Sequence, residues 1–101
     1  MKTITVCGSL KFKNEMMSIA LKMELEGNNV LVPICPADCD KDSLTEEEGE
    51  ILGKMHLEKI KISDAILVTN VGGYIGESTK KEIELAKSLN KEIIYYTDLV
   101  D

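Results

Sequence analysis

Glu82 is a carboxylate at a helix position where apolar side chains are expected. On a helical wheel it falls within an arc of apolar residues formed by Ile83, Leu85, Ala86 and Leu89. A carboxylate on the packing side of a helix needs a partner, a raised pKa or a cleft to face. Two interpretations follow. Either Glu82 caps its helix by reaching back to the Thr79 amide, as in a capping box, or it faces a binding site.

A glycine-rich loop precedes this helix, with the sequence Gly72-Gly73-Tyr74-Ile75-Gly76-Glu77-Ser78-Thr79. Glycines before a helix N-terminus can bring backbone amides against an anion, and the two hydroxyl residues add further donors. The same glycines could instead simply form a turn. The loop is not a P-loop, because no Gly-Lys-Ser/Thr sequence ends it. The candidate ligand contacts in this segment are Gly73, Tyr74, Gly76, Ser78 and Thr79.

Three further segments carry groups that could take part in chemistry. His56, the only histidine of the chain, lies one turn from Leu52 and Ile60 on its predicted helix. It is therefore either a satisfied residue at the core edge or a proton donor. Asp64 begins a predicted strand, where it could mark the turn or act in catalysis. The loop Gly8-Ser9-Leu10-Lys11 could contact a phosphate, or its lysine could simply be solvated.

The elements that must position these residues alternate between strands and helices. Strands are predicted at residues 2–7, 30–32, 64–70 and 91–97, and helices at about 12–26, 45–62 and 78–90. This order predicts one α/β domain over residues 1–101. It should have three layers and a Rossmann- or flavodoxin-like topology, with about four parallel strands and helices on both faces. Ligands bind at the carboxyl ends of such strands, so residues 8–11, 33–35 and 71–79 should meet there.

Composition limits the classes of partner. The formal net charge is -6 and all twelve basic residues are lysines, so we do not expect binding to a nucleic acid duplex. We find no apolar stretch long enough for a membrane and read the N-terminus as a strand, which predicts a cytoplasmic protein. Cys7, Cys35 and Cys39 are expected to be free thiols. No second ligand pair accompanies Cys35 and Cys39, so neither a metal site nor another cofactor is expected.

These segments together resemble the nucleoside 2-deoxyribosyltransferase superfamily, which includes the 2′-deoxynucleoside 5′-monophosphate N-hydrolases, over most of the chain. The resemblance lies in Cys7-Gly8-Ser9-Leu10-Lys11, Ile60-x-x-x-Asp64-Ala65-Ile66-Leu67-Val68 and Gly76-x-x-Thr79-x-x-Glu82-Ile83-x-x-Ala86. It implies that Glu82 is a nucleophile that attacks C1′ of the sugar as the base leaves. It also implies that Ser9, Lys11, Ser78 and the amides of residues 76–79 hold a 5′-phosphate or a sugar hydroxyl.

The sequence departs from the family pattern at two positions. His56 stands where family members place a carboxylate, and Glu84 replaces the usual glycine. We predict an N-glycosidase for 2′-deoxynucleoside 5′-monophosphates, with hydrolysis favoured over base transfer. The alternative is a non-catalytic module that binds or senses a small nucleotide or nucleoside.

We also predict a homo-oligomer, most simply a dimer. The apolar residues of the second helix cover more of its surface than one sheet contact needs: Ile51, Leu52, Met55, Leu57, Ile60 and Ile62. The resemblance implies the same, because family members complete their pockets with residues from a neighbouring subunit.

Overall fold

A four-stranded parallel sheet forms the centre of the computed structural model, which describes residues 1–36 and 41–100. The strands are β1 (Thr3–Cys7), β2 (Asn29–Leu31), β3 (Ala65–Val68) and β4 (Glu92–Tyr95), in the spatial order β2-β1-β3-β4. Ile4 of β1 pairs with Val30 on one side and with Ala65 on the other. The strand order reverses between β1 and β3, so the carboxyl ends of these two strands form the expected binding position.

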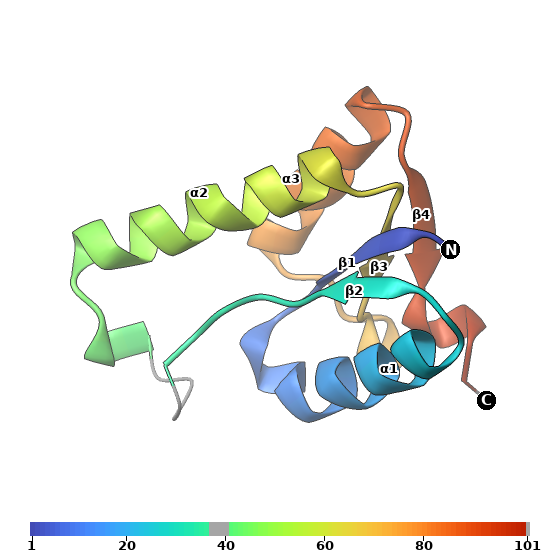
Figure 1. Cartoon of the computed structure of the whole chain (residues 1–101). Coiled ribbons are helices and arrows are strands. Elements are labelled where there is room, and N and C mark those ends of the chain that lie inside the picture. Colours follow the sequence, from blue (N-terminus) through green and yellow to red (C-terminus); the bar gives the residue numbers. More distant parts are fainter. Residues whose placement is uncertain (37–40, 101) are drawn as a thin grey trace.

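Helices cover both faces of the sheet, which confirms the predicted α/β architecture (Figure 1). Helix α1 (Lys13–Leu25) packs on one face, whereas α2 (Glu46–Ile62) and α3 (Glu77–Ser88) pack on the other. Side chains of β1 alternate between the two layers, as a strand requires. Ile4 and Val6 join the α1 core, while Cys7 joins the core beneath α2 and α3. Cys7 therefore ends β1 on the same face as the two site helices.

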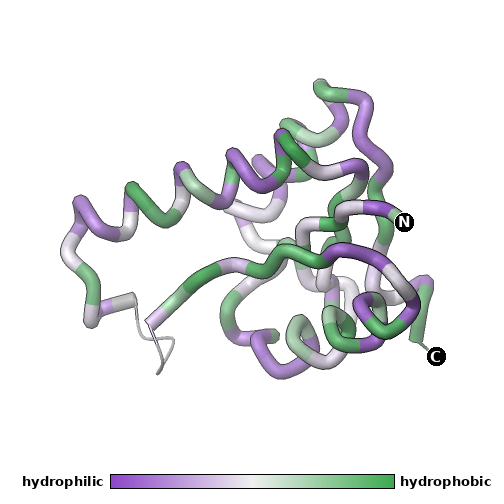
Figure 2. Tube along the Cα trace, in the orientation of Figure 1, coloured by the Kyte–Doolittle hydropathy of each residue, from purple (hydrophilic) through white to green (hydrophobic). Residues whose placement is uncertain are grey.

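The hydropathy pattern of α2 explains why only one side of this helix packs against the sheet. Figure 2 shows polar and apolar residues alternating along α2, as in an amphipathic helix. Thr45 caps α2 and forms a reciprocal capping box with Glu48, which places the start of the helix as predicted. All four residues of β3 are buried, because helices cover both of its faces.

The predicted capping box at Thr79 and Glu82 is wrong. Helix α3 begins at Glu77 with Gly76 as its N-cap, whose extended backbone starts the helix earlier than expected. Thr79 is then already the third helical residue, and Glu82 lies too far along the helix to cap it. The carboxylate of Glu82 must therefore have another environment.

The cysteines only partly match the expectation from the sequence. Cys7 is a free, buried thiol, but Cys35 is disulfide-bonded, so the prediction of a free thiol is wrong there. Cys39 lies outside the described residues, as does part of the loop predicted for residues 37–44. The described end of that loop, Lys41–Ser43, forms a short 3-10 turn. Within the described chain, no helix is long and apolar enough to cross a membrane.

Candidate active site

A cavity of about 490 Å³ opens at the carboxyl ends of β1 and β3. Three segments predicted to meet at this edge all contribute to its wall: Gly8, Ser9 and Leu10 after β1, Pro33 after β2, and residues of the glycine loop. Helix α2 closes another side. Of the predicted site residues, the cavity wall includes Gly8, Ser9, Leu10, His56, Tyr74, Gly76, Ser78, Thr79 and Glu82.

Gly8 lets the chain leave β1 directly beneath the cavity. A Cβ atom at this position would lie 3.0 Å from Thr69 Cβ and 3.3 Å from Met16 Sδ, which is too close for any other residue without a shift. The next residue, Ser9, then begins a 3-10 turn (Leu10–Phe12), and its Oγ accepts a hydrogen bond from the Lys11 amide at 3.4 Å. The backbone of Gly8 thus forms part of the cavity wall without a side chain to fill it.

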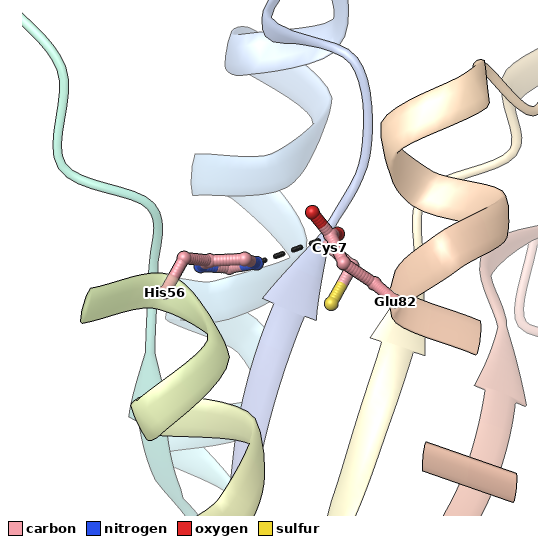
Figure 3. A group of neighbouring side chains, drawn as sticks. All are labelled: Cys7, His56 and Glu82. Atoms are coloured by element: carbon pink, nitrogen blue, oxygen red, sulfur yellow. Dashed lines mark ion pairs between the residues drawn. The ribbon is translucent and has the colours of Figure 1, made fainter. Parts of the chain in front are cut away.

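Glu82 projects from α3 toward His56 of α2, and the two side chains meet beside the end of β1 (Figure 3). Glu82 Oε1 lies 3.5 Å from His56 Nε2, and only 16% and 11% of the two side chains are exposed. His56 Nδ1 is buried and has no hydrogen-bond partner among the described residues. The Nε2 atom is therefore the ring nitrogen that can exchange a proton with groups in the cavity.

Cys7, at the end of β1, is the third member of this group. Its role was not predicted from the sequence. Ligand atoms of Cys7, His56 and Glu82 all lie within 4.8 Å of one another. Burial raises the pKa of the Cys7 thiol, and the charge of Glu82 and a hydrogen bond to that residue raise it further. Cys7 is therefore a neutral thiol at neutral pH, and its Sγ donates a weak hydrogen bond to Thr5 O at 3.9 Å. In the sequence, Cys7 is the last residue of the first predicted strand, and the carboxyl end of a parallel strand is where a binding site is expected.

The first turn of α3 presents backbone amides to the cavity. The N-cap, Gly76, has no side chain to accept hydrogen bonds from these amides, and within the described chain α3 has no side-chain cap. Gly76, Glu77, Ser78 and Thr79 all line the cavity. Free amides and the positive end of the helix dipole favour an anion at this position.

Helix α2 lines the cavity with residues that the sequence analysis did not select. Gly49, Leu52 and Gly53 share the cavity wall with His56. Their spacing puts them on one face of the helix. A Cβ atom built on either glycine meets nothing within 4 Å, so the helix backbone borders open space there. In the sequence, the spacing of Gly49, Gly53 and His56 could have indicated that these residues share one face of the helix.

Comparison with known proteins identifies the fold. No protein-family model matches the chain, and no curated protein matches it in sequence. Among solved structures, a 2-desoxiribosyltransferase from Leishmania mexicana matches with a TM-score of 0.69 and 17% identity, over 95% of this chain. The CMP N-glycosidase BcmB of Clostridium botulinum matches with a TM-score of 0.60 and 20% identity, over 93% of this chain.

The chain has the nucleoside 2-deoxyribosyltransferase-like fold. This confirms the fold implied by the sequence resemblance. The chain spans 64% of the length of the Leishmania protein and 67% of that of the Clostridium protein.

Within this deoxyribosyltransferase-like fold, Asp64 lies away from the cavity. It is exposed and immediately precedes β3, so it sits at the amino edge of the sheet, opposite to the cavity. Its Oδ2 accepts a hydrogen bond from the Thr3 amide at 2.9 Å, which joins the beginnings of two neighbouring strands. Asp64 therefore joins two strands in this arrangement and does not reach the group formed by His56 and Glu82.

Lys11 and Gly73 lie beside the cavity rather than in its wall. Lys11 Nζ sits 3.4 Å from the centroid of the Tyr74 ring and 5.3 Å from that of Phe12, in a cation–π arrangement. Phe12 also packs edge-to-face on Tyr74, with ring centroids 5.8 Å apart. Of these three residues, only Tyr74 lines the cavity. Lys11 contacts the Tyr74 ring and therefore lies next to the site.

Proposed function

We propose that the chain is an N-glycosidase that cleaves the base from a 2′-deoxynucleoside 5′-monophosphate, with Glu82 as the nucleophile. The observation that carries this proposal is the position of the Glu82 carboxylate, largely buried, in the cavity wall and 3.5 Å from His56 Nε2. A carboxylate beside a protonatable nitrogen, in a cavity next to an anion-binding helix end, suits the chemistry of an N-glycosidic bond.

The first step is attack of Glu82 on the sugar. A carboxylate oxygen of Glu82 forms a bond to C1′ while the bond from C1′ to the base nitrogen breaks, and the bonding electrons leave with the base. The result is a covalent sugar ester, as in a retaining glycosidase. His56 stands beside Glu82, so its Nε2 can supply a proton to the departing base.

Water completes the reaction in the second step. It attacks C1′ of the ester, the bond to Glu82 breaks, and the carboxylate is regenerated. His56, now neutral, can accept the proton of this water, so one residue acts first as acid and then as base. If a second base attacks instead of water, the same intermediate gives transfer. We favour hydrolysis because a phosphate contact, rather than a large base pocket, suits this small cavity.

The 5′-phosphate is assigned to the start of α3. The amides of residues 77–79 lack a side-chain cap, and the Ser78 hydroxyl adjoins them. Lys11 lies next to the cavity, on the Tyr74 ring, and its ammonium group could contact the phosphate if the side chain moved away from that ring. The chain has no arginine, so backbone amides, hydroxyls and lysine must provide the phosphate contacts.

The printed names of the two structural matches agree with this class of reaction, since one is a deoxyribosyltransferase and the other a CMP N-glycosidase. The rival function is a binding or sensing module without turnover, which the histidine at position 56 favours because the family resemblance expects a carboxylate there. Release of free base from a panel of deoxynucleotides and ribonucleotides, followed by chromatography, distinguishes the two functions.

We also propose that the protein functions as a homodimer. Exposed apolar side chains line the outer surface of α2, with Ile51 53% exposed, Met55 46% and Ile62 72%. Such a surface is unfavourable in water unless it is covered. A twofold dimer is the commonest way to cover it.

A further inference from the structure

We propose that Cys7, His56 and Glu82 form a binding site for a soft divalent cation such as Zn²⁺. The sequence alone predicts no metal site, because no second ligand pair accompanies Cys35 and Cys39. The fold instead brings one ligand from β1, one from α2 and one from α3 to a single point (Figure 3).

The spacing of the three ligand atoms suits zinc. With metal–ligand bonds of about 2.0–2.2 Å, nitrogen and oxygen ligands of a tetrahedral zinc ion lie roughly 3.4 Å apart. His56 Nε2 and Glu82 Oε1 are 3.5 Å apart already. No pair in the group exceeds 4.8 Å. With a zinc–sulfur bond of about 2.3 Å, the sulfur of a tetrahedral site lies about 3.5 Å from the other ligands, so Cys7 Sγ would have to approach by about 1.3 Å at most.

The chemistry of the donors selects the kind of cation. A thiolate, an imidazole and a carboxylate are typical zinc ligands, whereas Mg²⁺ and Ca²⁺ prefer sites built from oxygen alone. Three protein ligands leave a fourth position for water. His56 and Glu82 both line the cavity, so this position faces the cavity. The arrangement corresponds to an exchangeable zinc site rather than a closed structural one.

Charge balance also favours a cation here. Among the described residues Glu82 forms an ion pair with His56 and with no lysine, so a bound cation would supply a counter-charge for its carboxylate. Binding of Zn²⁺ breaks the S–H bond of Cys7, releases that proton to water and forms a sulfur–metal bond. The two anionic ligands then neutralise the charge of the ion.

The surroundings of His56 predict reversible rather than permanent binding. Zinc-binding histidines ordinarily donate their other ring N–H to an acceptor, which strengthens metal binding. His56 Nδ1 has no such acceptor in the described part of the chain. Because the ion would occupy the Glu82 carboxylate, it would also block the proposed nucleophile; this consequence alone rests on the proposed function.

The test is a titration with Co²⁺, a coloured substitute for zinc, in buffer without added thiols. We expect a near-ultraviolet charge-transfer band from a Co²⁺–thiolate bond in the wild type and its loss in Cys7→Ser. His56→Gln and Glu82→Gln should each weaken binding by about tenfold or more. The matched control is Glu84→Gln, on the same helix but with 77% of its side chain exposed, which should bind like the wild type.

A second measurement keeps the test decisive if Cys7→Ser folds poorly by circular dichroism. His56 is the only histidine, so the imidazole signals in a proton NMR spectrum belong to it. Zn²⁺ should shift these signals in the wild type, and in Glu82→Gln the same shift should require about tenfold or more higher zinc concentrations. A charge-transfer band that persists in Cys7→Ser, or unmoved His56 signals in the wild type, would overturn the proposal. Both readouts need no substrate, so they stand apart from the outcome for glycosidase activity.

Discussion

His56 Nε2 lies 3.5 Å from Glu82 Oε1, and both side chains are largely buried at the cavity wall. Each residue comes from a different helix, and both helices pack on the same face of the sheet. The pair therefore depends on how α2 and α3 dock rather than on either helix alone. A buried carboxylate next to an imidazole is the kind of arrangement that moves protons in enzymes.

Replacing His56 with glutamine should lower kcat for base release by about 10²–10⁴-fold, because the departing base loses its proton donor. KM should change much less, since the proposed phosphate contacts are made by α3. Steady-state kinetics with a deoxynucleoside monophosphate measures both constants. Lys54→Gln, an exposed change on the same helix, is the control. An unchanged kcat in His56→Gln would exclude a role for this residue in proton transfer.

A 5′-phosphate should account for a large part of ligand binding. Deoxynucleoside monophosphates should raise Tm more than the corresponding nucleosides, because only the nucleotides reach the amides at the start of α3. Ser78→Ala should weaken nucleotide binding by roughly tenfold, the loss expected for a hydrogen bond to a charged group. Ser88→Ala, at the other end of α3, where its hydroxyl donates to Leu85 O, should leave binding unchanged. Equal Tm shifts for nucleosides and nucleotides would argue against the phosphate site.

The buried thiol of Cys7 predicts a stability that falls at high pH. Its pKa is raised in the folded protein by burial and then by Glu82. Above the ordinary thiol pKa, the unfolded chain therefore loses a proton that the folded chain keeps. The free energy of unfolding should fall by up to about 1.4 kcal/mol per pH unit in that range.

Urea unfolding between neutral and alkaline pH, with a chelator present, measures this slope. Cys7→Ala should flatten it. Glu82→Gln should reduce it in part, because burial would remain as a cause of the raised pKa. A slope in Cys7→Ala equal to that of the wild type would assign the pH dependence to other groups.

The exposed apolar surface of α2 predicts a dimer. Light scattering should give a mass of about twice the 11.2 kDa of one chain. Ile51→Glu should shift the protein toward the monomer, because a charge on the covered surface would be desolvated without a partner. Glu50→Gln, at the neighbouring exposed position, should leave the mass unchanged. A wild-type mass near that of a single chain would contradict this prediction.

The elements of this fold could largely be predicted from the sequence, because they follow from local patterns. Alternation marks β1, an apolar run marks β3, and Thr45 with Glu48 marks the start of α2. The start of α3 at Glu77 is within one residue of the predicted start, but its cap differs: the capping pattern of Thr79 and Glu82 is not used, and the extended Gly76 is the N-cap. The sequence cannot decide between Gly76 and Thr79 as the N-cap, because glycine adopts many backbone conformations and its own sequence gives no preference for the extended one.

The candidate site could be predicted only in part. The inward position of Glu82 and the glycine loop indicated the right edge of the sheet. The contact of His56 with Glu82 could not be predicted, because it depends on the docking of two helices. Asp64, a candidate from the sequence, lies at the opposite edge because the direction of β3 puts the residue before the strand there, where it accepts a hydrogen bond from the Thr3 amide. Cys7 was overlooked because it resembles an ordinary core residue.

The amide variant Glu82→Gln shows whether the carboxylate of this residue is the nucleophile. Glu82→Gln keeps the shape of the side chain but removes the nucleophile. It should reduce base release from a deoxynucleoside monophosphate by at least about a thousandfold while leaving nucleotide binding and Tm close to those of the wild type. Glu84→Gln, whose parent side chain is exposed on the same helix, should keep full activity.

The decisive measurement is the amount of free base released by wild type, Glu82→Gln and Glu84→Gln under identical single-turnover conditions. We expect release by the wild type and Glu84→Gln and almost none by Glu82→Gln. Equal release by all three proteins would contradict Glu82 as the nucleophile, and nucleotide binding without release by the wild type would contradict the proposed glycosidase in favour of a binding module.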